Sequence, residues 1–111
     1  LEYAVEHLGV SLIVVMGHSD CGAVTSACSG RMDEWTGATA GVLRAIEPAV
    51  RAARAECVGE DDLIDAAARL NVDKQAEVLT ASPVIREALA EGRVALQSAW
   101  YDLSTGLVSW L

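Results

Sequence analysis

The run Ser11–Met16 (SLIVVM) constrains the fold of this chain more than any other segment, because it is continuously apolar and β-branched at its centre. A strand with one face in water alternates apolar and polar residues, whereas a continuously apolar strand is typical of a parallel sheet covered on both faces. Parallel neighbours need helical crossovers between them. The segment therefore predicts an α/β fold, with a mostly parallel sheet flanked by helices.

Hydrophobic periodicity assigns the other elements. Pro48 stands inside a helical pattern and predicts a kink or break near Ile46. Asp61 and Asp62 occupy positions where a helix N-cap is expected, and Ser82-Pro83 is typical of an N-cap followed by the first helical residue. We expect helices over 1–8, 23–28, 39–56, 62–81 and 83–91, strands over 11–16 and 93–103, a short C-terminal hairpin strand over 107–111, and loops over 17–22 and 29–41. Residues 1–111 are predicted to form a single domain.

Charge and cysteine content limit the class of partner and the compartment. Eight basic and sixteen acidic residues give a net charge of −8, which argues against nucleic acid or an anionic membrane as the partner. The longest apolar run, Leu12–Met16, is too short to span a bilayer. Three cysteines cannot all pair within one chain, so we expect free thiols and a cytoplasmic location. Because Leu1 begins within an amphipathic segment, we expect the chain to be part of a longer protein.

The segment that carries the clearest chemical signal is Gly17–Gly22 (GHSDCG), which follows the apolar strand and precedes a helix. Ligands of open α/β sheets bind at this edge of the sheet. His18 and Cys21 are three positions apart, and an imidazole nitrogen and a thiolate are both ligands of tetrahedral zinc. From the residues alone, two readings stay open: His18 and Cys21 bind a metal together, or they only cap a turn.

Two other chemistries fail on the same residues. The segment is close to the G-x-S-x-G turn of serine hydrolases, but the order of that triad requires a histidine after Ser19, and none follows His18. A cysteine phosphatase needs an arginine six residues after its nucleophile, and neither Cys21 nor Cys28 has one. Serine hydrolysis and cysteine-based phosphate hydrolysis are therefore excluded for this chain.

Together with the rest of the chain, this segment resembles the β-class carbonic anhydrases, and the resemblance covers essentially all 111 residues. The resemblance is carried by the strand–GHSDCG–helix element and by the ending Tyr101–Gly106 (YDLSTG), in that order along the chain. Further similarities lie between them, at Asn71, Val72, Gln75, Ser82, Pro83, Val84, Ile85 and Gly92. The fold that this resemblance implies is a β-carbonic-anhydrase-like α/β domain.

The resemblance also implies a reaction and a cofactor. His18 and Cys21 would be two of the three protein ligands of a Zn²⁺ ion. Zinc would lower the pKa of a bound water toward about 7, and the resulting hydroxide would attack carbon dioxide to form bicarbonate. No further catalytic side chain and no other cofactor is expected in this chain. His7, Cys28 and Cys57 are expected to be structural or surface residues.

This sequence departs from the family pattern in one large respect. The third zinc ligand of the family is a cysteine in a C-x-D-x-R motif on an earlier strand, and this motif does not occur in the 111 residues. We therefore expect an N-terminally truncated domain that is inactive by itself. The missing strand would also leave 12–16 with an unpaired edge, which predicts a homodimer or a higher homo-oligomer.

Two alternative functions accompany the prediction of carbon dioxide hydration. The first is a non-catalytic carbonic-anhydrase-like module that dimerises or regulates a partner. The second is hydrolysis of carbon disulfide or carbonyl sulfide, since enzymes with those substrates resemble this family.

Overall fold

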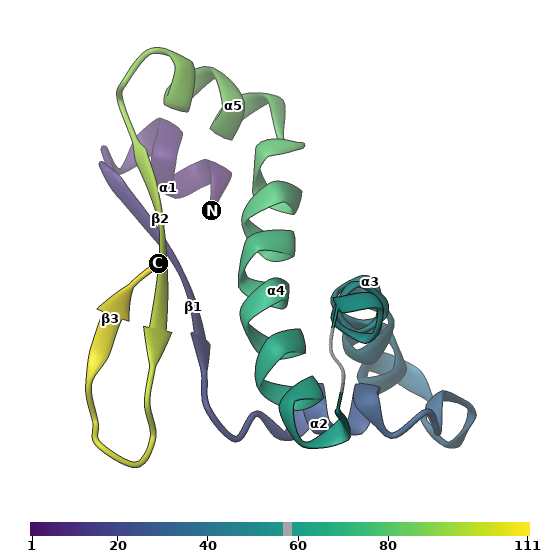
Figure 1. The fold of residues 1–111 in the computed structure, drawn as a ribbon. Coiled ribbons are helices and arrows are strands. Elements are labelled where there is room, and N and C mark those ends of the chain that lie inside the picture. The colour runs from purple at the N-terminus through teal and green to yellow at the C-terminus, as the bar shows by residue number, and fades with distance from the viewer. Residues whose placement is uncertain (57–58) are drawn as a thin grey trace.

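A computed structural model describes residues 1–56 and 59–111 (Figure 1). Within these residues, a small sheet packs on one side against a long helix, and two further helices pack beside the lower end of that helix (Figure 1). The elements in chain order are α1 (Glu2–His7), β1 (Leu12–His18), α2 (Gly22–Cys28), the 3₁₀ turn η1 (Met32–Glu34), α3 (Gly37–Glu56), α4 (Glu60–Thr80), α5 (Pro83–Ala90), β2 (Ala95–Tyr101) and β3 (Val108–Trp110).

The sheet has the order β1-β2-β3. β1 and β2 are parallel over their full lengths, from the pair Leu12–Ala95 to the pair His18–Tyr101, and the chain between them includes all the larger helices. β3 returns antiparallel to β2 and forms the expected C-terminal hairpin, with Ala99 opposite Trp110. The predicted α/β class is confirmed, and the sheet is small and mixed, with the parallel pair longer than the antiparallel one.

β1 differs from its prediction in length and in burial. The strand continues through Gly17 and His18, which were expected in a loop, because both residues pair with β2. Its alternate residues Leu12, Val14 and Met16 are 48%, 37% and 53% exposed. The expectation of a strand buried on both faces is therefore wrong for the described residues. The physical reason is that α4 covers one face of the strand pair, while the other face has no cover among those residues.

α3 also differs from its prediction. The expectation near Ile46 was a kink or a break, and the break does not occur, because the helix is continuous from Gly37 to Glu56 with Pro48 inside it. The apolar stripe of α3, which includes Leu43 and Val50, is buried against α2 and α4, and this packing offsets the backbone hydrogen bond that proline cannot make. The predicted loop over 29–41 contains η1 and the first turn of α3.

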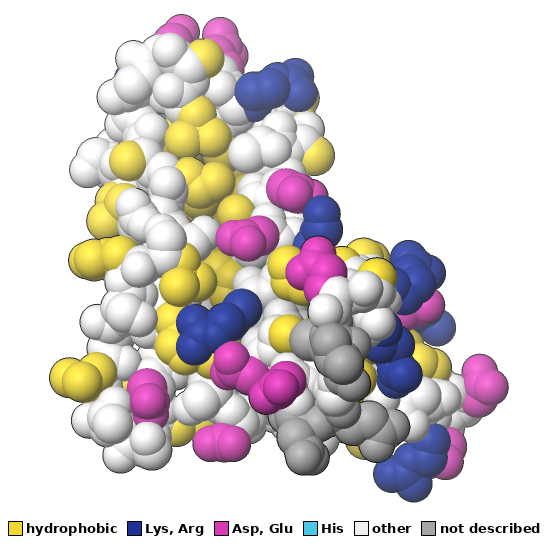
Figure 2. Space-filling model, in the orientation of Figure 1, with side chains coloured by type: hydrophobic (Ala, Val, Ile, Leu, Met, Phe, Trp, Pro, Cys, Tyr) yellow, Lys and Arg dark blue, Asp and Glu magenta, His cyan; other side chains and the backbone are white. Residues whose placement is uncertain are grey.

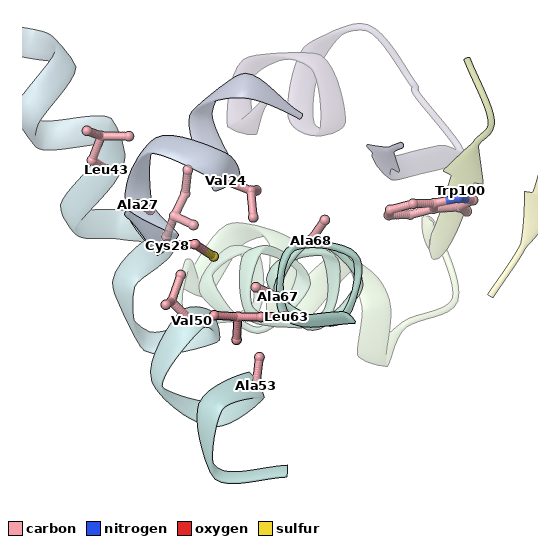
Figure 3. Packing of buried hydrophobic residues seen from close by; sticks show 11 residues of the cluster. Val24, Ala27, Cys28, Leu43, Val50, Ala53, Leu63, Ala67, Ala68 and Trp100 are labelled. Carbon is pink, nitrogen blue, oxygen red and sulfur yellow. The ribbon is translucent and has the colours of Figure 1, made fainter. Parts of the chain in front are cut away.

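The larger hydrophobic core lies where α2, α3 and α4 meet. In Figure 3 the side chains of α2, α3 and α4 gather between the three helices, with Cys28 near the centre of the group. Alanine at 27, 53, 67 and 68 lets these helices approach closely, and Cys28 is buried among them, as expected. Trp100 of β2 closes the cluster on the sheet side. The buried residues of this core are Val24, Ala27, Cys28, Leu43, Ile46, Val50, Ala53, Leu63, Ala67, Ala68 and Trp100.

A second, smaller core lies at the other end of the sheet, where α1 and α5 cover β1. Val5, Ile13 and Ile85 are buried there. Ser82 begins α5 as predicted: its Oγ accepts a hydrogen bond from the Ile85 N–H and donates one to Glu2 of α1 at 2.6 Å. The predicted N-cap of α4 is displaced, because Gly59 is the N-cap and the helix begins at Glu60. Among the described residues, no helix is long and apolar enough to cross a membrane.

Candidate metal centre

His18 and Cys21 are brought together by a tight turn between β1 and α2. His18 is the last residue of β1, and Cys21 is the N-cap of α2 with extended backbone angles. Asp20 between them has φ +55, in the left-handed region that aspartate tolerates better than most residues. The chain thereby reverses within two residues, so that both candidate ligands lie at the carboxyl end of the strand.

The imidazole of His18 is oriented by the backbone of the next residue. Its Nδ1 lies 2.8 Å from the carbonyl oxygen of Ser19. Because a carbonyl oxygen only accepts hydrogen bonds, Nδ1 carries the hydrogen and donates it. In the neutral ring Nε2 then holds a free lone pair, which is the form of histidine that binds metals. The local hydrogen bonding therefore selects a metal-binding tautomer.

Cys21 is held through its main chain, and its thiol is not engaged in a disulfide. Its carbonyl oxygen accepts hydrogen bonds from the N–H and the Oγ1 of Thr25, at 2.9 and 3.0 Å. The residue is half-buried. These bonds anchor the start of α2 and place a free, partly accessible thiol at the turn.

His18 and Cys21 both line one cavity of about 260 Å³. The turn forms one wall, and α4 and β2 form the other, with Asp65 and Trp100 among its residues. The sequence interpretation did not place Asp65 at this site. Its only signal was the spacing to Arg69, one helical turn on, which proved to be a salt bridge with 2.8 Å between Nε and Oδ2. Arg69 also lies over the Trp100 ring, 4.1 Å from the centroid.

Cys28 does not belong to this site. It is buried and lines a different cavity of about 360 Å³, with Arg54 and Leu63. Burial raises the pKa of the Cys28 thiol, and the nearby charge of Arg54 opposes that shift only in part. The thiol form expected for a structural cysteine is therefore favoured. His7 is exposed at the surface, as expected. Cys57 lies outside the described residues.

The donors at the turn match zinc in kind and fall short in number. An imidazole nitrogen and a thiol sulfur are appropriate zinc ligands, and catalytic zinc sites take three ligands from the protein. Within residues 1–56 and 59–111, no three His, Cys, Asp or Glu side chains are grouped so that they could hold a metal ion. The described residues thus provide a pair of suitable donors, and a complete site needs at least one more.

Comparison with known proteins gives the family of this chain. The family model for carbonic anhydrase matches residues 1–108. A carbonic anhydrase of Pseudomonas aeruginosa is 40% identical over 113 residues, which cover 100% of this chain and 51% of the relative.

Solved structures give the same family. A Coccomyxa β-carbonic anhydrase in complex with acetazolamide has a TM-score of 0.86 and 31% identity, over 99% of this chain and 50% of that one. A β-carbonic anhydrase of Sordaria macrospora, described as tetrameric, has a TM-score of 0.84 and 33% identity, over 99% of this chain and 56% of that one. The chain spans about half the length of these relatives. By sequence and by fold, it belongs to the β class of the carbonic anhydrase family.

Proposed function

We propose that the full-length protein that carries this chain catalyses the zinc-dependent, reversible hydration of carbon dioxide to bicarbonate. His18 Nε2 and Cys21 Sγ are the two zinc ligands that this chain contributes. The observation that carries the proposal is that both side chains line one cavity, while the Ser19 carbonyl holds His18 in the tautomer whose Nε2 is free.

The proposed reaction needs a nucleophile that exists at neutral pH. When bound, zinc supplies it as a Lewis acid that lowers the pKa of water to about 7. The residues of this chain hold the ion and shape the space beside it: His18 and Cys21 bind, and Trp100 and Ile64 provide apolar wall against which a small uncharged substrate can lie. Carbon dioxide fits such a space without needing a charged contact.

We place the third protein ligand on a strand that pairs with the free edge of β1. Among the described residues, β1 pairs with β2 only, so one edge of a seven-residue strand is available. A strand there would end beside His18 at the carboxyl edge of the sheet, where a side chain can reach the same cavity. Assembly as a homodimer or higher homo-oligomer belongs to the same proposal and is supported by the tetrameric Sordaria relative.

The proposal is tested by single substitutions in the full-length protein, with zinc content and stopped-flow carbon dioxide hydration measured on the same samples. His18→Ala and Cys21→Ser are each expected to lose zinc and to lower hydration by several orders of magnitude, because the Lewis acid leaves with the ligand. Cys28→Ser is the matched control, since this cysteine lines the other cavity. Full activity with zinc still bound in Cys21→Ser would refute the assignment.

A non-catalytic role as a carbonic-anhydrase-like module is the second candidate. It is favoured by one observation, the lack of a third metal donor beside His18 and Cys21 in the described part of the chain. The wild-type protein in the same experiment separates the two candidates: bound zinc and hydration support the enzyme, whereas metal-free, inactive protein supports the module. Activity on carbon disulfide or carbonyl sulfide is assayed in parallel. A cytoplasmic location stays a prediction, based on the free thiols of Cys21 and Cys28.

A further inference from the structure

The turn that holds the candidate ligands is bonded to a second loop, far away in the sequence. The Ser19 N–H donates to the carbonyl oxygen of Tyr101 at 3.0 Å. The Ser19 Oγ accepts a hydrogen bond from the N–H of Leu103 at 2.9 Å, across 84 residues of sequence. Ser19 is therefore attached by its main chain to the end of β2 and by its side chain to the turn that follows β2.

The same residue orients His18. The carbonyl oxygen of Ser19 accepts the hydrogen bond from His18 Nδ1. The bonds at the Ser19 N–H and Oγ restrict rotation of this residue, and they thereby restrict the direction of its carbonyl. Asp20, the next residue, has a left-handed backbone conformation, so the backbone that follows the Ser19 carbonyl also has little rotational freedom.

The loop that donates to Ser19 is itself rigidly built. The Asp102 carboxylate accepts hydrogen bonds from the Ser104 N–H at 2.8 Å and from the Thr105 N–H at 3.1 Å. The Gly106 N–H donates to the Asp102 carbonyl at 2.8 Å. These bonds hold Leu103 at the head of a closed turn, so that its N–H is presented to Ser19 as a fixed donor.

We propose that Ser19 is a positioning residue of the metal centre, which holds His18 with Nε2 available by tying the ligand turn to the Tyr101–Gly106 turn. The inference rests on the proposed function of His18 as a ligand. In metal sites generally, the hydrogen-bond partner of the imidazole nitrogen that does not bind the metal sets the tautomer and the orientation of the ring. Loss of such a partner typically lowers metal affinity about 10- to 100-fold. In this role Ser19 acts through His18, whose Nδ1 hydrogen bond the Ser19 carbonyl accepts.

The experiment compares Ser19→Ala, Ser19→Thr and Ser29→Ala in the full-length protein. Ser19→Ala removes the acceptor for Leu103, and Ser19→Thr keeps a hydroxyl in the same place. Ser29→Ala is the matched control, because its Oγ also accepts a hydrogen bond from a backbone N–H, that of Arg31 at 3.4 Å, but at the far end of α2. Three quantities are measured: zinc affinity by chelator competition, the His18 tautomer by ¹⁵N NMR of the metal-free protein, and hydrogen exchange of the Leu103 N–H.

The expected result is specific to the hydroxyl. Ser19→Ala weakens zinc binding about 10-fold, the low end of the range for such partners. It also speeds exchange at Leu103 and gives a mixture of His18 tautomers, where the native protein has the Nδ1–H form. Ser19→Thr restores all three quantities, and Ser29→Ala changes none.

Other results overturn the inference. If Ser19→Ala leaves zinc affinity and tautomer unchanged while Leu103 exchanges faster, Ser19 only joins two loops. If His18 of the native protein has the Nε2–H tautomer, the inference is wrong. This measurement needs no substitution, so it decides the question even if the Ser19 variants do not fold. Absence of zinc at His18 in the native protein would refute the proposed function, whereas the tautomer and exchange measurements on metal-free protein still decide the role of Ser19.

Discussion

At the scale of single residues, Gly17 decides how closely α4 lies on the sheet beside the ligand turn. Gly17 pairs with Trp100 in the register of β1 and β2. A Cβ added at Gly17 would lie 3.1 Å from Cζ3 of Trp100 and would overlap Cγ2 of Val72 on α4. This backbone position therefore has room for glycine only. The identity of the residue next to His18 is set by how closely the sheet and α4 pack.

We therefore predict that Gly17→Ala destabilises the protein by about 1–3 kcal/mol, the typical cost of overpacking a core. The measurement is chemical or thermal unfolding of the variant against the wild type. The double variant Gly17→Ala/Val72→Ala is expected to recover part of the loss, because it removes the methyl group that the new Cβ would meet.

Gly41→Ala provides the control for this prediction. Gly41 lies inside α3, and no atom lies within 4 Å of a Cβ added there. Alanine in that open helical position is expected to raise stability by about 0.5–1 kcal/mol. Equal effects of the two glycine substitutions would show that β1 and α4 are not packed as closely as described.

At the scale of elements, the turn between β2 and β3 depends on one carboxylate. Hydrogen bonds from the Ser104 hydroxyl, first, and then from the Thr105 and Ser104 N–H groups lower the pKa of Asp102. Since each donor favours the charged form, the turn and the ionised carboxylate stabilise each other. Asp102 is half-buried in a turn whose following residues are exposed, and we expect the effect to be confined to the turn and to the position of Leu103.

The pH dependence of this turn has a defined sign. Because the pKa of Asp102 is lower in the folded turn than in the unfolded chain, its stabilisation is present above the unfolded pKa and is lost as pH falls through the folded pKa. We expect the Ser104 and Thr105 amide shifts in NMR to move in that acidic range, together with the Asp102 carboxyl carbon. In Asp102→Asn, which cannot ionise, the movement should vanish. An Asp102 carboxyl that titrates at or above its ordinary value would contradict the assignment.

At the scale of the whole molecule, one face of the sheet is apolar and uncovered by the described residues. The register pairs Val14 and Met16 of β1 with Gln97 and Ala99 of β2, and it pairs Ala99 with Trp110 of β3, so these side chains share a face. Trp110 is 65% exposed there. In Figure 2, hydrophobic side chains gather over the strands and their boundary with α4, whereas charged ones gather over α3 and α4.

We predict that the 111-residue chain associates with itself at micromolar concentration through this face, because burying it removes apolar surface from water. Light scattering measures the mass of the particle. Val14→Lys is expected to shift the particle mass toward that of a monomer. Val42→Lys, at an exposed position of α3, is the control that should leave the mass unchanged. A wild-type chain that is monomeric and unfolds cooperatively would show that this face is stable in water.

Structural features that depend on neighbouring residues in the sequence were predictable. Ser82 and Pro83 begin α5 because their own side chains satisfy the requirements of a helix start. Pro48 does not break α3, because its local effect is opposed by packing against residues distant in sequence. At the site, His18 and Cys21 were recognisable from spacing, whereas Asp65 reaches the same cavity from a helix that begins more than thirty residues later. The hydrogen bond between Ser19 and Leu103 has no signal in either segment.

The sequence by itself determined the α/β class, the order of the elements and the pair of candidate ligands, since these depend on periodicity and on residues a few positions apart. Only the tertiary structure decided which face of β1 is covered, where Pro48 is tolerated, and which atom of His18 is available. Each of these depends on contacts across tens of residues: α4 lies over one face alone, α3 is held by two other helices, and the turn of His18 is anchored to the end of β2. Such contacts are set by packing and hydrogen-bond geometry, which exist only once the chain has folded.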